Sequence, residues 1–124
     1  EKEEFRFKVL AKMLQPFPDI SLVGYASERE EMFRLLQNAP VDVLLFDITL
    51  FRNESSNLIS LLNSGFPRLK VIVCTDNHLG YYFRETMSNC MVSAHTPKAI
   101  DAPELVGLVS EVFHAPEEQQ ADTA

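Results

Sequence analysis

Three polar side chains stand at the ends of apolar runs that are typical of buried β-strands. Asp47 ends the run VDVLLFD, Thr75 ends the run LKVIVCT, and Lys98 follows the weaker run MVSAH. In an open parallel sheet, the carboxyl ends of the strands meet at one edge, and ligands bind there. We therefore expect a carboxylate, a hydroxyl and an ammonium to meet at one edge of a sheet.

This combination of groups suits the transfer of a phosphoryl group to an aspartate. The carboxylate attacks phosphorus and becomes an acyl phosphate. The transferred group carries delocalised negative charge, which an ammonium and a hydroxyl can stabilise. A divalent cation, held by carboxylates and a backbone carbonyl, usually supplies the remaining positive charge. We therefore predict Asp47, Thr75 and Lys98 as the reactive group, with Mg²⁺ as the cofactor if the site is functional and no cofactor otherwise.

Each of the three residues also has an ordinary structural explanation. An aspartate at a strand end often caps the following loop, and threonine is favoured in strands. Lys98, next to Pro97, also fits a solvated loop. Taken one at a time, these explanations stay open, and it is the placement of all three at strand ends that favours a site.

Composition narrows the classes of protein to consider. The chain has 124 residues, of which 46% are hydrophobic and 23% charged, and this fits a single globular domain. The net charge is −7 and no Lys/Arg cluster is present, which argues against a nucleic-acid surface on this segment. No apolar run could span a bilayer and no signal-like start is present, so we expect a cytoplasmic protein without a membrane partner. Cys74 and Cys90 are interpreted as small, reduced hydrophobic residues.

Helix and strand patterns alternate along the chain. We predict strands at 20–25, 42–47, 69–75 and 91–95. We predict helices at 4–15, at 56–64, at 79–89, from the capping box at 27–30 to Pro40, and from the cap Asp101 through Phe113. This order indicates an α/β sandwich with a parallel sheet covered by helices on both sides. The acidic segment 115–124 has no aromatic residues and is predicted to be a disordered tail or linker after a domain at 1–114.

The chain resembles the receiver domain of bacterial two-component response regulators, most closely the NarL/FixJ type. The segments that carry the resemblance are FPDISLVGYAS (17–27), PVDVLLFDITL (40–50), FPRLKVIVCT (66–75) and KAIDAPEL (98–105). The resemblance covers residues 1 to about 114 and implies a flavodoxin-like (CheY-like) doubly wound parallel sheet of strand order 2-1-3-4-5. The pattern opens on a helix, so the first strand of that order is missing from this segment.

The resemblance also implies roles for individual residues. Asp47 would be the phosphoacceptor, Thr75 the hydroxyl that moves onto the phosphoryl group, and Lys98 the phosphate-facing lysine. His95 would take the place of the family's switching aromatic residue, if one extra residue lies between Thr75 and Lys98. The backbone carbonyl of Thr49 would face the metal.

The sequence departs from the family pattern in two places, the acidic pair and the glycine loop. The family's acidic pair matches Glu1 and Lys2, and lysine cannot ligate a hard cation. The Lys2 ammonium could instead take the metal's place and neutralise Asp47, whereas Glu1 would remain as a metal ligand. The glycine loop that follows the acceptor is replaced by FRNES (51–55).

Two functions follow from this resemblance. In the first, a histidine kinase phosphorylates Asp47, and the module controls an output, most plausibly transcription, without being an enzyme beyond slow autodephosphorylation. In the second, a pseudo-receiver acts through phosphate-independent protein interaction or dimerisation. A homodimer is a family expectation, and DNA would be bound only by an output domain absent from this segment. A cofactor-binding enzyme is disfavoured, because no glycine-rich loop follows any predicted strand.

Overall fold

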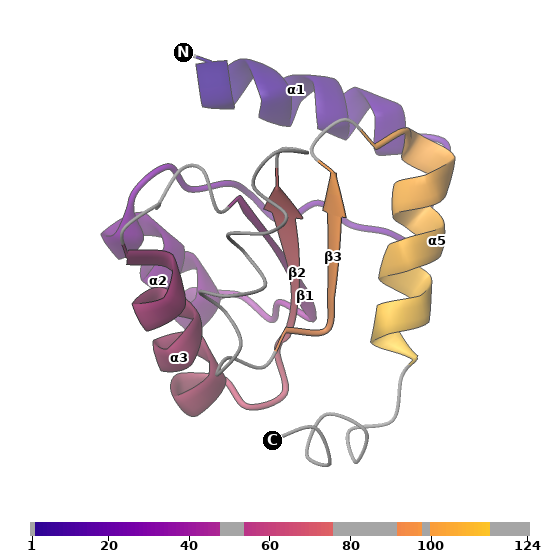
Figure 1. Cartoon of the computed structure of the whole chain (residues 1–124). Coiled ribbons are helices and arrows are strands. Elements are labelled where there is room, and N and C mark those ends of the chain that lie inside the picture. The colour runs from indigo at the N-terminus through magenta and orange to yellow at the C-terminus, as the bar shows by residue number, and fades with distance from the viewer. Residues whose placement is uncertain (1, 48–53, 76–91, 98–99, 115–124) are drawn as a thin grey trace.

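The computed structural model describes residues 2–47, 54–75, 92–97 and 100–114, apart from the side chains of residues 2–4, 55 and 75 (Figure 1). The helices are α1 (Lys2–Leu14), α2 (Arg29–Asn38), α3 (Ser55–Gly65) and α5 (Ala102–Phe113). The strands are β1 (Val43–Asp47), β2 (Lys70–Thr75) and β3 (Ala94–Pro97). The predicted helix at 79–89 and the predicted tail at 115–124 lie outside the described residues.

The three strands form one parallel sheet in the order β1-β2-β3. The central strand β2 is buried on both faces, and Val71, Ile72 and Val73 are all at most 2% exposed. Strands of this kind have long apolar runs because helices cover both faces of a parallel sheet. The predicted α/β class with a parallel sheet is therefore confirmed. The order 2-1-3-4-5 with five strands stays a prediction.

Helices lie on both sides of the sheet. Figure 1 shows α2 and α3 on one side, α5 on the other, and α1 across the end to which the strand arrows point. The core between the sheet and α2 and α3 consists of large apolar side chains from all of these elements. Its buried members are Met32, Leu36, Phe46, Leu58, Ile59, Leu62, Leu69, Val71 and Val73.

The prediction of a strand at residues 20–25 is wrong. The segment has no regular secondary structure and forms no ladder, and no strand lies beside it in the described part of the chain. A strand needs a partner for its backbone N–H and C=O groups. In the predicted order, the only neighbour of this strand would be the strand that precedes the first helix. Side-chain packing holds the segment instead, including the Tyr25 ring against Phe7 at 4.9 Å between centroids.

The last predicted strand is displaced along the chain. It is predicted at 91–95, but β3 covers Ala94–Pro97 because its ladder with β2 runs from Ile72 opposite Ala94 to Thr75 opposite Pro97. Proline is tolerated there because β3 is an edge strand of the described sheet and needs no donor on its free side.

The two predicted helix caps have different outcomes. Asp101 caps α5 as predicted, and its side chain accepts a hydrogen bond from the Glu104 backbone N–H at 2.9 Å. The capping box at 27–30 is wrong, because α2 begins one residue later and its N-cap Glu28 makes no side-chain cap bond. The Ser27 hydroxyl instead donates to the carboxylate of Glu31 at 3.4 Å.

Candidate functional site

The carboxyl ends of the three strands meet at one edge of the sheet, as predicted for the candidate site. Asp47 ends β1 and Thr75 ends β2, while β3 ends at Pro97, directly before Lys98. The register places Asp47 opposite Cys74, and Cys74 opposite Thr96. Thr75 therefore lies one residue beyond the row of Asp47. Lys98, Thr49 and Glu1 lie outside the described residues, so their predicted roles stay predictions.

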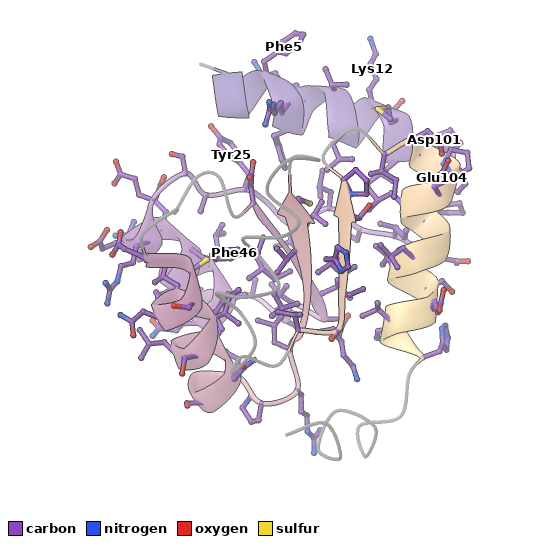
Figure 2. All side chains as sticks on the ribbon, in the orientation of Figure 1. Phe5, Lys12, Tyr25, Phe46, Asp101 and Glu104 are labelled. Carbon is purple, nitrogen blue, oxygen red and sulfur yellow. The ribbon has the colours of Figure 1, made fainter. Side chains whose placement is uncertain are left out.

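The pleat of β1 sets the direction of the Asp47 side chain. Successive side chains of a strand point to opposite faces of the sheet. Phe46 points into the core against α2 and α3, where its side chain is 2% exposed (Figure 2). Asp47 therefore belongs to the face away from α2 and α3. Its side chain is 27% exposed, so the carboxylate is partly covered but open to small molecules from solvent.

A cation from α1 lies beside this carboxylate. The Arg6 Nη1 atom is 3.6 Å from the Asp47 Oδ2 atom, and the Arg6 side chain is 47% exposed. The contact fits the position of α1 across the carboxyl end of the sheet (Figure 1). A partly exposed ion pair is typically worth roughly 0.2–1 kcal/mol of stability. The ion pair therefore matters mainly because it places a positive charge beside the Asp47 carboxylate.

The sequence analysis did not single out Arg6. It placed a cation near Asp47, but assigned that position to Lys2, the first residue of α1. Arg6 follows Lys2 by four residues, and residues four apart share a face of a helix. That spacing was the only sequence signal that pointed to Arg6. It was not sufficient to predict Arg6, because the sequence does not show how α1 is oriented against the strand ends.

Small, uncharged side chains occupy the same row of the sheet as Asp47. Cys74 is buried, as expected for a small hydrophobic residue, and its reduced state stays a prediction. Thr96 is also buried, and its hydroxyl donates to the backbone carbonyl of Pro97 at 3.4 Å. Cys90 lies outside the described residues. The row thus places one carboxylate next to neutral groups.

His95 lies one residue before this row. It stands opposite Val73 in the ladder, and its side chain is exposed. The resemblance to receiver domains implied a switching role for this ring. That role stays a prediction.

Asp47 is the only predicted Mg²⁺ ligand among the described residues, since Glu1 and Thr49 lie outside them, so the Mg²⁺ site stays a prediction. Mg²⁺ takes oxygen ligands in octahedral geometry, usually including one or two carboxylates. Among the side chains that the structure describes, no three His, Cys, Asp or Glu residues come together where they could hold a metal ion. The group placed against Asp47 is a guanidinium, which cannot be a ligand and repels a divalent cation.

A second electrostatic contact lies at the N-terminus of α5. The negative charge of Asp101 raises the pKa of the Glu104 carboxyl above its ordinary value, and a hydrogen bond between the two side chains adds to this effect. A small desolvation effect acts in the same direction. Figure 2 shows both residues at the start of α5.

Comparison with known proteins identifies the fold. The structure is similar to the crystal structure of a response regulator from Thermotoga maritima, with a TM-score of 0.75 and 21% sequence identity over 90% of each chain. No protein-family model matches the sequence. A comparison with curated proteins also gives no match. Within the described residues, no helix has the length and apolar character needed to cross a membrane. The chain thus has the flavodoxin-like fold of that response regulator.

Proposed function

We propose that the chain is a receiver-type signalling module whose input is the carboxylate of Asp47. The observation that carries this proposal is the position of Asp47 at the carboxyl end of β1, in a fold shared with a response regulator. That edge is where open α/β sheets bind ligands. The carboxylate is 27% exposed and can therefore be reached by a phosphodonor.

In the proposed reaction, an Asp47 oxygen attacks the phosphorus atom of a phosphorylated donor. The new oxygen–phosphorus bond forms as the bond to the donor's leaving group breaks, and the leaving group departs with the electron pair. Asp47 then carries an acyl phosphate. The Thr75 hydroxyl and the Lys98 ammonium would stabilise its charged oxygens. The chain accepts the group without turning over a substrate, apart from slow loss of the phosphoryl group to water.

The signalling context is a proposal of the same kind. The donor would be the phosphohistidine of a histidine kinase, and the response would be a population shift reported by Thr75 and His95. We propose a NarL/FixJ-type receiver at 1–114 in strand order 2-1-3-4-5, followed by a linker at 115–124. We also propose that the chain is cytoplasmic, forms a homodimer and controls transcription. DNA would be bound by a separate output domain.

A second candidate function is a phosphate-independent interaction module. The ion pair between Arg6 and Asp47 favours it, because the carboxylate already has a cation beside it. In this candidate, the same fold presents its helices to a protein partner, and Asp47 has a structural role.

The two candidates are separated by measuring intact mass after incubation with acetyl phosphate. The parent chain should gain one phosphoryl group, and Asp47→Asn should gain none. Asp42→Asn is a matched control, because Asp42 lies directly before the opposite end of β1. Uptake by Asp47→Asn would show that the acceptor is assigned wrongly. Uptake by none of the chains would favour the interaction module.

A further inference from the structure

Arg6 lies at the edge of the sheet where the candidate site is located. Its guanidinium lies 3.6 Å from the Asp47 carboxylate, at the carboxyl end of the sheet. This is the edge where the proposed chemistry needs a positive charge. Guanidinium groups are always charged at physiological pH, and their planar N–H donors match carboxylate and phosphoryl oxygens. Arg6 therefore has the charge and the geometry that an anion on Asp47 requires.

The position of Arg6 is determined by more than its own ion pair. The neighbouring residue Phe7 packs on Tyr25 with 4.9 Å between ring centroids. At the other end of α1, Leu14 is 7% exposed, and α1 contacts α5. Figure 2 shows Tyr25 on the sheet side of α1, whereas Phe5 and Lys12 point away from the sheet. These contacts hold α1 across the strand ends with Arg6 on the side of Asp47.

The surroundings of the carboxylate support the same interpretation. Its neighbours in the sheet row, Cys74 and Thr96, are uncharged and buried. No group of three His, Cys, Asp or Glu side chains that could hold a metal ion occurs in the described ranges, which do not include the other predicted ligands Glu1 and Thr49. A divalent cation at Asp47 would lie within a few ångströms of the guanidinium, and the two positive charges would repel each other strongly.

We infer that Arg6 is the resident cation of the Asp47 site and takes the place of a divalent metal. The charge that balances Asp47, or a phosphoryl group on it, comes from α1 and not from a bound ion. This inference deepens the proposed function. Its statement about a phosphoryl group on Asp47 rests on that proposed function. The ion pair and the exclusion of metal can be tested without any phosphorylation.

The first test measures the thermal midpoint of unfolding with and without MgCl₂. A metal bound through Asp47 would raise the midpoint of the parent by roughly 4–7 °C at about ten times its Kd. We expect the parent and Asp47→Asn to respond identically to Mg²⁺. A midpoint that rises with Mg²⁺ in the parent, but not in Asp47→Asn, would overturn the inference.

The second test is a double-mutant cycle of Arg6→Met and Asp47→Asn, measured by urea unfolding. For an exposed ion pair we expect a coupling of about 1.4- to 5-fold in the unfolding equilibrium constant. The matched control is Arg29→Met, which removes the other described arginine ion pair, Arg29 to Glu54 at 3.4 Å. Its cycle with Asp47→Asn should show no coupling. Additive effects of Arg6→Met and Asp47→Asn would overturn the inference.

Phosphoryl uptake then separates this inference from the proposed function. If the parent takes up a phosphoryl group from acetyl phosphate, the rate in EDTA should be within about threefold of the rate in Mg²⁺. Arg6→Met should lose about tenfold or more in EDTA, corresponding to one lost charge-assisted contact, and Arg6→Lys should retain part of the rate. Strict Mg²⁺ dependence with no effect of Arg6→Met would overturn the inference and leave the receiver function intact. Absence of uptake by every chain would remove the phosphoryl function, and the first two tests would still decide the inference.

Discussion

The cap of helix α5 gives the sharpest prediction about stability. The Asp101 side chain accepts a hydrogen bond from the Glu104 backbone N–H at 2.9 Å, and this is one of the N–H groups that a helix start leaves unpaired. Replacing an N-cap aspartate by alanine costs about 1 kcal/mol. For a domain of this size, that loss lowers the thermal midpoint by about 3–6 °C. It also lowers the urea midpoint by roughly 0.3–1 M at an unchanged m-value.

The variant Asp101→Asn tests whether the hydrogen bond or the charge is responsible. Asparagine keeps the acceptor oxygen, loses the favourable interaction of the charge with the helix N-terminus, and removes the repulsion of Glu104. We expect its urea midpoint to lie close to that of the parent, whereas Asp101→Ala loses the full amount. If both variants lose equally, the charge is responsible and the cap argument fails.

The same pair of residues predicts a pH dependence. Asp101 raises the pKa of Glu104 in the folded chain. The folded chain therefore binds the Glu104 proton more tightly than the unfolded chain does. This favours folding below the ordinary pKa of a glutamate carboxyl and is lost as the pH rises through the raised pKa of the folded chain. The stability of Asp101→Asn relative to the parent should therefore increase from acidic to neutral pH. A difference between the two chains that is constant with pH would contradict this assignment of the shift.

Two further substitutions test the packing that holds the site. Phe46→Ala removes a fully buried side chain next to Asp47 and should lower the free energy of unfolding by about 3–5 kcal/mol, measured by urea unfolding; a loss below 1 kcal/mol would contradict its place in the core. Phe7→Leu removes the aromatic contact with Tyr25 and should cost about 0.5–1.5 kcal/mol and raise amide hydrogen exchange in α1. Phe5→Leu is its control, because Phe5 is 67% exposed, and its effect should stay within about 0.5 kcal/mol; equal effects of the two variants would refute the role of the Phe7 contact.

The Arg6–Asp47 ion pair changes how the two candidate functions are compared. A working receiver needs positive charge at the acceptor, and a pseudo-receiver needs its carboxylate neutralised. A guanidinium at 3.6 Å meets both requirements. The choice between them therefore depends on whether the carboxylate reacts with a phosphodonor, and not on whether the site contains a cation.

Much of the fold could be predicted from the sequence because the signals are local. The runs VLLFD and KVIVCT are continuous and apolar, and the structure places them in neighbouring parallel strands. Asp101 was predictable as a cap because the hydrogen bond joins residues only three positions apart. The position of Asp47 at a strand end follows from the same local pattern.

Other features depend on contacts between distant parts of the chain. Residues 20–25 have the composition of a strand, but a strand exists only where another strand satisfies its backbone groups. The ladder with β2 determines where β3 lies, so β3 extends past the end of the predicted run. Composition does not show which strand would pair with residues 20–25, or where β2 pairs with β3.

The sequence by itself determined the two parallel strands β1 and β2 and that one carboxylate stands where β1 ends. This is because apolar runs and strand-end residues act through their immediate neighbours. Only the tertiary structure decided that Arg6 supplies a cation to that carboxylate. The orientation of α1 across the strand ends results from its packing on Tyr25 and on α5. Helix periodicity shows which residues share a face, but it does not show what that face meets.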